Sequence, residues 1–555
     1  MTNNLPIASA LRSCLKKGYT AQDFTRDFAA GLVVSLVALP LAMALAIAIG
    51  LPPQYGLYTA IVAGIVTPLL GGSIWQVSGP TAAFVVILAP IVTEFGLRGI
   101  IWCEILAGII ILAMGLLRLG RYISFVPYPV TTGFTAGIAV VIGTLSLKDF
   151  LGLPIGQLED SYIGKVSQIA EALPNLHLHD AGIGIFTLLV IIFFPKITKK
   201  IPSPIVGISL AAVLAWFLAQ RFGADISTIG NRFHYTLPNG AIGNGVPPLP
   251  PELHLPGEAQ NPLYAWPSFD ELKTFMMPAL VIAALGALES LLSATVADSM
   301  AGTRHNPNAE LSGIGIANII TGLFSGIPAT GAIARTATNV NAGAKTPLAS
   351  TLHGFFLLIY MLSLAPLIAY VPMAALSALL LITAWRMSHV HQFVTILKIA
   401  PMTDKITLAA CFAFTVFIDM VAGVSIGFAL ATLFLMKRVA DLTHINVITN
   451  EDDHKKKPEK DTLVLNITGP LFFGSAEQMV DRLGHFDDHD WKKIIVDMGD
   501  MTLIDMTGMA ALSSLLLTTT RGGRQVTLRG QAQTLDKILH QIPKNIADTI
   551  RLERI

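Results

Sequence analysis

The sequence has little charge. Of its 555 residues only 13% are Asp, Glu, Lys or Arg, whereas 53% are hydrophobic, and the mean hydropathy is +0.63. A soluble globular chain carries about 25% charged residues. The deficit is concentrated, because residues 28–93 form a run of 66 residues without one charged side chain. Since a membrane-spanning helix needs about 20 apolar residues, this run excludes a soluble fold and indicates a polytopic membrane protein.

Other features that the sequence lacks exclude further classes. Three distant cysteines, Cys14, Cys103 and Cys411, exclude a disulfide framework and a cysteine metal site. A net charge of +1 gives no indication of a nucleic-acid partner. The first 27 residues hold neither an apolar stretch nor a small-residue cleavage site, so we expect no signal peptide.

The chain also lacks two motifs of membrane enzymes and pumps. It has no phosphate-binding G-x-x-x-x-G-K-[ST], since Ala344 precedes Lys345, and it has no H-E-x-x-H. We therefore predict that it is not an enzyme, with no catalytic residue, no cofactor and no metal. A secondary transporter, a channel and a membrane-bound sensor remain open.

The apolar segments number about fourteen. They are residues 28–50, 55–70, 79–93, 100–117, 130–147, 181–195, 205–219, 276–301, 311–327, 331–342, 347–370, 373–385, 406–419 and 420–436. The loops that would be outside if the N-terminus is cytoplasmic, residues 148–180 and 221–273, hold five basic against ten acidic residues. Because basic residues concentrate in cytoplasmic loops, we expect both termini in the cytoplasm.

The character of the chain changes after the last apolar segment. Residues 451–461 (EDDHKKKPEKD) are too polar to pack. Beyond them, short apolar runs at 462–467, 493–497 and 525–528 read as strands, and residues 508–518 read as a helix. We predict a cytoplasmic N-terminal segment (1–27), a transmembrane domain (28–438), a charged linker (439–461) and a small α/β domain (462–555).

Two short segments broken by Gly and Pro occupy corresponding halves of the chain. One opens at Ser78-Gly79-Pro80 and the other at Gly331, with Arg335 just inside it. Such segments are typical of secondary transporters, in which the N-termini of half-helices point at an anionic substrate. The free N–H groups and positive dipoles of two such ends, with Arg335 beside them, predict a small anion site. The alternatives are that Gly and Pro only kink ordinary spans and that Arg335 reaches a membrane face.

Glu289 lies near the middle of the segment 276–301, and Ser293 shares its helix face. A carboxyl group in a low dielectric takes up a proton more readily than in water. Proton uptake there, coupled to anion entry, would reduce the charge that must cross. The alternative is a protonated glutamate that only forms a hydrogen bond with a neighbouring helix.

Four stretches resemble the SulP family of anion transporters, the sulphate permeases. They are Pro53-Gln54-Tyr55-Gly56-Leu57-Tyr58-Thr59-Ala60 leading to Gly71-Gly72-Ser73, Ser78-Gly79-Pro80-Thr81-Ala82, Gly302-Thr303-Arg304-His305-Asn306 with the residues up to Asn318, and Thr468-Gly469-Pro470-Leu471-Phe472-Phe473. They occur in the order typical of the family. The stretches ALPLAMALAIAIG, VSGPTAAFVVILAP and GALESLL are similar to those of its bacterial C4-dicarboxylate transporters.

The resemblance implies about 14 spans as seven plus seven inverted repeats, a core domain that moves against a gate domain, and a C-terminal STAS domain. It implies a homodimer, and a possible cytosolic protein partner for the STAS domain. Carried over by motif, the substrate would meet the backbone near Thr81, Ala82 and Ala83, and near Ala334 and Arg335. Glu289 would couple transport to a cation, with Ser293 where some sodium-coupled relatives have a ligand; glutamate favours protons over sodium.

The stretch Leu503 to Gly508 resembles the STAS loop in which related proteins carry a phosphorylatable serine, and Thr507 occupies that position. A phosphate there would be favourable at a helix N-terminus. The preferred interpretation is that Thr507 caps the helix.

These features together predict proton-coupled uptake of C4-dicarboxylates (succinate, fumarate, aspartate) across the bacterial cytoplasmic (inner) membrane. Sulphate or bicarbonate transport is the nearest alternative, and a channel-like anion path is another. A sensor or scaffold built on the STAS domain is the alternative from a different class.

Overall fold

The computed structural model describes residues 7–554 apart from 122–126, 157, 160, 199–200, 238–239, 259–260, 449–460, 476–490, 522–523, 532–534, 537, 539 and 541–549. The chain divides into two compact units, Met1–Phe428 and Ala429–Ile555. The first is helical and the second is built on a β-sheet, so we describe each by itself.

The first unit has the apolar helices of a polytopic membrane protein. Among the described residues, nine helices are long and apolar enough to cross a bilayer. Every apolar segment predicted from the sequence falls on a helix. The helices are α2 (Ala21–Ala48), α3 (Pro53–Leu70), η1 (Ala82–Phe84) with α4 (Val85–Leu116), α5 (Tyr128–Phe150), α7 (Leu178–Phe193), α8 (Ser203–Phe222), α10 (Phe269–Ala301), α11 (Pro307–Leu323), α12 (Ile333–Asn341), α13 (Pro347–Ile368), α14 (Met373–Met387), α16 (Met402–Phe417) and α17 (Met420–Ala440).

Helix α4 contains two of the predicted segments. At Gly96 its backbone adopts φ 61° and ψ −156°, which are not helical values. Only glycine adopts a positive φ at little cost, so this residue allows the chain to turn between the two pieces. The stretch from Ala82 to Gly96 is therefore a half-helix, and a second helix follows it.

The order of elements in the first half of this unit recurs in the second half. Two long helices are followed by a three-residue strand, a half-helix and four further helices. The strand is β1 (Ser78–Pro80) in the first half and β4 (Ala329–Gly331) in the second. The unit also has shorter elements, which are α1 (Ser9–Lys16), α6 (Tyr162–Ala172), α9 (Ile229–Arg232), α15 (Val390–Ile399) and the hairpin of β2 (His234–Thr236) and β3 (Ile242–Asn244).

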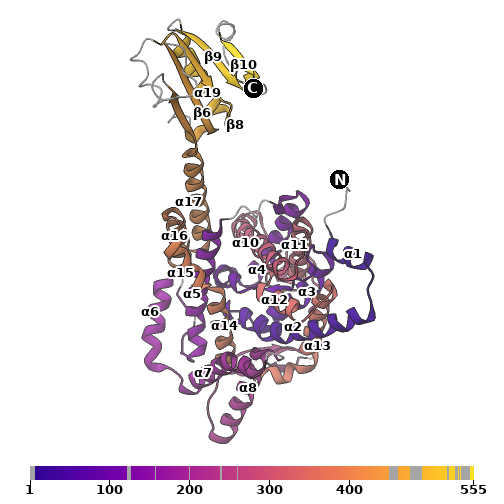
Figure 1. The fold of residues 1–555 in the computed structure, drawn as a ribbon. Coiled ribbons are helices and arrows are strands. Elements are labelled where there is room, and N and C mark those ends of the chain that lie inside the picture. The colour runs from indigo at the N-terminus through magenta and orange to yellow at the C-terminus, as the bar shows by residue number, and fades with distance from the viewer. Residues whose placement is uncertain are drawn as a thin grey trace. The chain divides into compact units, whose positions relative to one another are not determined.

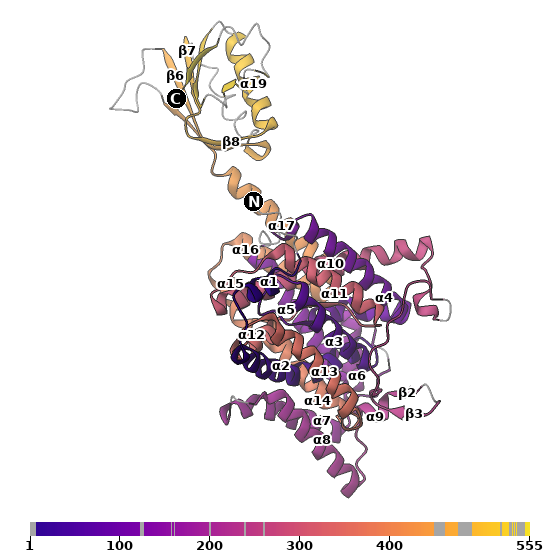
Figure 2. The ribbon, with the colours of Figure 1, turned by 90° about the vertical axis from the view of Figure 1, so that its right-hand side faces the viewer.

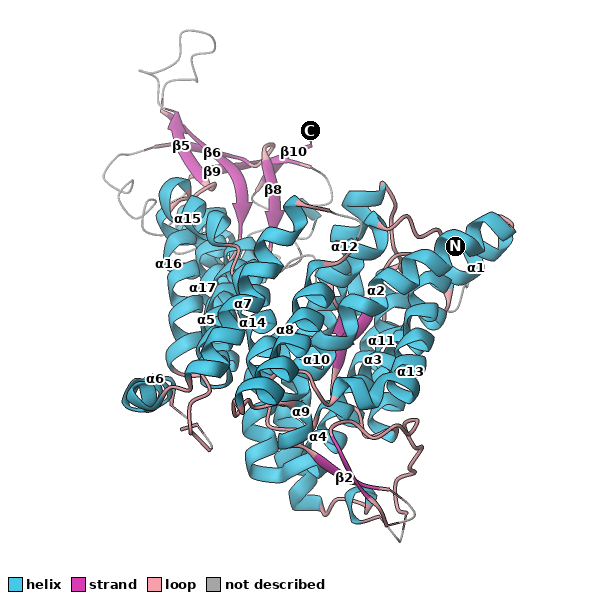
Figure 3. Cartoon of the chain, turned by 90° about the horizontal axis from the view of Figure 1, so that it is seen from below, coloured by secondary structure: helices cyan, strands magenta, loops and turns pink. Residues whose placement is uncertain are grey.

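The helices pack into two bundles, which can be told apart in Figure 1. The first bundle joins α2, α3, α4, α10, α11, α12 and α13, and the second joins α5, α7, α8, α14 and α16. Figure 3 shows the strands β1 and β4 as the magenta ribbons enclosed by helices of the first bundle. The elements predicted to form the anion site thus lie inside one bundle.

Several helix starts follow from local sequence. Thr20 with Asp23, and Ser268 with Glu271, form capping boxes at the starts of α2 and α10. In each box the two side chains accept hydrogen bonds from backbone N–H groups that the helix leaves unpaired. Pro occupies the first turn of α3, α11 and α13, where its missing N–H costs nothing.

The second unit is an α/β domain with a six-stranded sheet in the order β10-β9-β7-β6-β5, with β8 paired to β6. The strands are β5 (His444–Ile448), β6 (Thr462–Leu471), β7 (Lys493–Asp497), β8 (Met501–Ile504), β9 (Gln525–Gly530) and β10 (Arg551–Arg554), and helix α19 (Met506–Arg521) packs against them (Figure 2). A core of Leu, Ile, Val and Met side chains lies between helix and sheet. Strand β5 lies within the range predicted as linker, and residues 449–460 of that range lie outside the described residues.

Candidate anion-binding site

The two half-helices begin at a shared pair of strands. Strands β1 and β4 pair antiparallel, with Ser78 opposite Gly331 and Pro80 opposite Ala329. Because a strand of three residues spans only about 10 Å, the start of η1 and the start of α12 lie at opposite ends of one short ladder. The helices leave the ladder in opposite directions, so both N-termini face its centre.

The first turns of these helices supply backbone donors. N–H groups in the first turn of a helix have no acceptor within that helix, which at this site concerns Ala82, Ala83, Ala334 and Arg335. Thr81 adopts an extended conformation before η1, and its side chain is half-buried. Ala82 and Ala83 are buried, whereas Ala334 is exposed. With the dipoles of both helices, these donors favour a small anion.

Arg335 lies behind strand β1. Its side chain is 1% exposed, and its Nη2 donates a hydrogen bond to the carbonyl oxygen of Pro80. In the described part of the chain, Nε and Nη1 have no hydrogen-bond partner. A buried cation without a paired carboxylate is costly, by several kcal/mol. Its charge would be offset by an anion held at the strand pair.

Glu289 reaches the same strand pair from helix α10. The hydroxyl of Thr330, in β4, donates a hydrogen bond of 3.0 Å to Glu289 Oε2, and the side chain of Thr81 also interacts with this carboxylate. The residue is half-buried. The structure therefore brings the predicted coupling residue beside the predicted substrate residues at the end of β1.

Ser293 lies one turn further along α10 and has a different partner. Its hydroxyl donates to the hydroxyl oxygen of Thr336 at 3.1 Å, and the same oxygen accepts from the backbone N–H of Val77 at 3.0 Å. Ser293 thus helps to fix helix α12 to the chain that enters β1. This is a positioning contact, and it does not reach Glu289 in the described residues.

Sequence reasoning missed the side chains that hold the ladder in place. Ser290 accepts from the N–H of Gly331 at 3.1 Å, and Asn318 forms hydrogen bonds with the N–H and the carbonyl oxygen of Ala329. Glu310 accepts from the N–H groups of Gly72 and Ser73 and from Gln76 Nε2, each at 2.7 Å. Single polar residues in apolar segments were the available signal, but nothing in the sequence says which backbone group each one meets.

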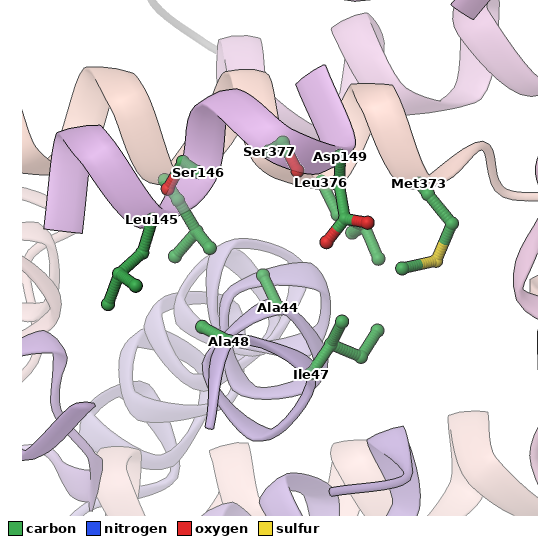
Figure 4. Close-up of a pocket in the computed structure, with 10 residues that line it drawn as sticks. Ala44, Ile47, Ala48, Leu145, Ser146, Asp149, Met373, Leu376 and Ser377 are labelled. Atoms are coloured by element: carbon green, nitrogen blue, oxygen red, sulfur yellow. The ribbon is translucent and has the colours of Figure 1, made fainter. Parts of the chain in front are cut away.

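Besides a cavity of about 510 Å³ that α8 lines together with α2 and α13, two further cavities in the described residues lie where the two bundles meet. One, of about 20 Å³, is lined by α2, α5 and α14, and Figure 4 shows Ser146, Ser377 and Asp149 around it with the small residues Ala44 and Ala48. The other, of about 330 Å³, lies between α4 and α10 of the first bundle and α5, α16 and α17. The bundles thus meet less tightly at these places.

In the second unit, the cap of helix α19 is Asp505. Its Oδ1 accepts from the N–H of Gly508 at 2.8 Å, and its Oδ2 accepts from the N–H of Phe473 at 3.1 Å. The interpretation that Thr507 caps the helix is therefore wrong, because Asp505, one residue before the helix begins, already accepts the capping hydrogen bond. Thr507 lies in the first turn with an exposed side chain.

One enzyme motif occurs in the chain, but it lies inside a helix. Gly423-Val424-Ser425-Ile426-Gly427 has the spacing G-x-S-x-G. In hydrolases the serine sits on a sharp turn from a strand into a helix. Here the motif lies inside helix α17, so it forms no nucleophile elbow.

Comparison with known proteins shows the family of the chain. A model of the "Sulfate permease family" matches residues 24–410, and a model of the "STAS domain" matches residues 454–547. The chain belongs to the sulfate permease family. It is accordingly an anion transporter with a STAS domain and not an enzyme, as the resemblance implied, and the predicted fold class is confirmed.

Relatives with curated names cover nearly the whole chain. A "Putative sulfate transporter YvdB" of Bacillus subtilis is 36% identical over 529 residues, 95% of each chain. A "Bicarbonate transporter BicA" of Picosynechococcus sp. is 27% identical, over 91% of this chain and 88% of its own.

Solved structures show the same fold. The transmembrane domain of a cyanobacterial bicarbonate transporter BicA matches with a TM-score of 0.61 and 27% identity, over 73% of this chain and 98% of that domain. Murine Slc26a9, an anion transporter in the inward-facing state, matches with a TM-score of 0.82 over 98% of this chain and 92% of its own. At 17% identity the second likeness shows the fold alone.

The contact between Gly79 and Arg335 yields the first prediction. A Cβ atom added at Gly79 would lie 2.5 Å from Arg335 Nη1, and the φ of Gly79 is 155°. We expect Gly79→Ala to displace the guanidinium and to lower stability by about 1–3 kcal/mol through overpacking. The measurement is the shift in melting temperature that sulfate or bicarbonate produces in the purified protein, which should shrink in the variant.

The matched control for this variant is Gly143→Ala in helix α5, where an added Cβ would meet nothing within 4 Å. This control should keep the anion-dependent shift. A Gly79→Ala protein with an undiminished shift would show that Arg335 is not needed in its present position.

Proposed function

We propose that the protein is a proton-coupled secondary transporter that takes up a small oxyanion through the site between η1 and α12. The observation that carries the proposal is Arg335, a fully buried cation whose one hydrogen bond in the described chain goes to a backbone carbonyl. Its uncompensated charge lies beside two helix N-termini, and all three features favour negative charge. A sensor or scaffold has no need of this costly arrangement.

Glu289 supports the proton-coupled part of the proposal. It is a half-buried carboxyl group that contacts Thr330 of β4, so it lies in the same bundle as the anion site and moves with it. Protonated, it would add no charge to the loaded site; ionised, it would repel an anion from it. An anion and a proton would therefore enter together, and neither would be favoured alone.

Two substrate classes have separate support. Stretches of the sequence are similar to those of C4-dicarboxylate transporters, which favours succinate, fumarate or aspartate. Relatives at 36% and 27% identity are named for sulfate and for bicarbonate, which favours those compact oxyanions. Backbone N–H groups recognise charge in either class, and the residues around them, Ala82, Ala83 and Ala334, carry no side-chain donor that would select one.

The test is uptake of labelled sulfate, bicarbonate and succinate by proteoliposomes at two external pH values. We expect saturable uptake of at least one anion, faster when the outside is the more acidic side. A pH difference of one unit can drive about tenfold accumulation for each coupled proton. A channel would show no accumulation above equilibrium, and a sensor or scaffold would show no uptake of any anion.

The role of Glu289 yields a further prediction. Glu289→Gln keeps the shape of the side chain and its contact with Thr330 but removes the titration. We expect this variant to lose the roughly tenfold accumulation per pH unit while it still exchanges labelled for unlabelled anion. Glu94→Gln, an exposed carboxyl on α4, serves as the control and should accumulate normally. Gradient-driven accumulation by Glu289→Gln would remove Glu289 from the coupling mechanism.

We further propose that the protein lies in the bacterial cytoplasmic membrane as a homodimer, with both termini in the cytoplasm. The excess of acidic over basic residues in the loops 148–180 and 221–273 supports this orientation. Fusion of a reporter that is fluorescent only in the cytoplasm to the C-terminus tests the orientation, and the mass of the detergent-solubilised protein tests the dimer.

Thr507 is proposed as a regulatory position. Its side chain is exposed in the first turn of α19, where a phosphate would meet the positive end of the helix. Mass spectrometry of the protein purified from its host would detect phosphate at Thr507. If it occurs, Thr507→Val should remove the phosphate without unfolding the domain, because Asp505 supplies the cap.

A further inference from the structure

Behind strand β1, helices α12 and α13 share a fully buried polar face. Arg335 and Asn339 lie one turn apart on α12, and Ser350 and His353 lie one turn apart on α13. Asn339 Nδ2 donates to the carbonyl oxygen of Trp75 at 2.9 Å and to Ser350 Oγ at 3.1 Å. These side chains are at most 1% exposed, so whatever satisfies their remaining polar atoms must lie inside the protein.

His353 is held in one tautomer. Its Nδ1 lies 2.8 Å from the carbonyl oxygen of Ser350. Because a carbonyl oxygen can only accept, Nδ1 carries the hydrogen, and in the neutral ring Nε2 is an acceptor. A Cβ atom added at Gly64 of α3 would lie 2.5 Å from His353 Cε1, so α3 closes the far side of this ring.

Of these buried side chains, Arg335, Asn339 and His353 each leave at least one polar atom unsatisfied. Within the described residues, the atoms without a partner include Arg335 Nε and Nη1, Asn339 Oδ1, His353 Nε2 and, on the same face of α3 as Gly64, Thr67 Oγ1. Arg335 lies within electrostatic range of His353. Ser350 links Asn339 to His353, and His353 contacts α3 at Gly64, one turn before Thr67. These side chains therefore lie where α3, α12 and α13 meet, whereas Arg335 Nη1 faces Gly79 of β1.

The mixture of donors and acceptors selects the ligand. Arg335 offers only donors, Asn339 Oδ1 and His353 Nε2 only accept, and the hydroxyl of Thr67 can do both. An anion would be repelled by the two acceptors, and a cation would be repelled by Arg335. Water both donates and accepts, and buried waters characteristically bond to about three polar groups that would otherwise be unpaired.

We propose that ordered water occupies an internal chamber lined by Thr67, Arg335, Asn339 and His353, and that His353 is a positioning residue that acts on Arg335 through this water. The water would hold the guanidinium against the Pro80 carbonyl from behind, on the side away from the anion. The chamber would thus be part of the machinery that keeps a positive charge at the strand pair.

The direct test is a structure of the full-length protein by electron cryomicroscopy at a resolution that resolves ordered water. We expect density within hydrogen-bonding distance of Arg335 Nε, Asn339 Oδ1 and His353 Nε2. His353→Gln, which keeps an acceptor, should retain this density, and His353→Leu should lose at least part of it. Absence of density in the wild type, with the side chains packed together, would overturn the proposal.

The variant Thr67→Val distinguishes a Thr67 hydroxyl that binds water from one that has no partner. If Thr67 Oγ1 has no partner at all, removing it relieves a buried unpaired group and raises the melting temperature. If the hydroxyl binds water of the chamber, the same change lowers it. We expect a lower melting temperature, and a rise would contradict the chamber. Thr295→Val, on the exposed face of α10, is the matched control.

The positioning role rests on the proposed transport function, so it has its own readout. We expect His353→Leu to raise the KM for the transported anion by about tenfold, the effect of losing one buried hydrogen-bond network, with kcat little changed and with recovery in His353→Gln. Equal KM values in the two variants would overturn the positioning role. A wild type that transports none of sulfate, bicarbonate and succinate would overturn the proposed function, while the density and Thr67→Val would still decide the chamber.

Discussion

The pairing of β1 with β4 is the constraint on which the rest of the transport unit depends. Three residue pairs, from Ser78 with Gly331 to Pro80 with Ala329, fix where two half-helices begin. Were the ladder to slip by one residue, the start of η1 and the start of α12 would no longer face the same centre. The side chains of Ser290, Asn318, Thr336 and Glu310, which form hydrogen bonds with the backbone of this region, all serve to keep that register.

A second constraint follows from the first. In the proposed site, a cation behind a backbone strand would attract the anion without offering it a side chain to bind directly. This placement buries a guanidinium with few hydrogen-bond partners, which is costly. Any further partners must come from the interior of the bundle. The polar face of α12 and α13, with Asn339 and His353, lies where that need arises. The proposed anion site and its support therefore lie on two sides of the same strand.

Much of this arrangement could be predicted from the sequence. Gly79, Pro80 and Gly331 marked the breaks, and Arg335 and Glu289 stood out because charged residues are rare in apolar segments. The direction of the Arg335 side chain could not be predicted, because its partner Pro80 lies 255 residues away in the chain. For the same reason the cluster of Thr67, Asn339 and His353 was not visible, since it exists only after α3, α12 and α13 have packed.

In the second unit, two local sequence patterns differ from the structure. Thr507 has a good capping side chain, yet it lies inside the first turn, whereas Asp505 lies just before the helix and accepts from the N–H of Gly508. Strand β5 lies in a stretch assigned to the linker, because a strand at a sheet edge is recognised by its partner β6 and not by its own composition.

Recognition by main-chain amides has a consequence for how such proteins diversify. Every residue except proline keeps its backbone N–H, so in the proposed site other replacements at Ala82, Ala83 or Ala334 would keep the donors that attract negative charge. Substitutions of neighbouring side chains could then change which anion is preferred while the affinity for negative charge is kept. In this way a few mutations could change the transported anion from one nutrient to another without an inactive intermediate.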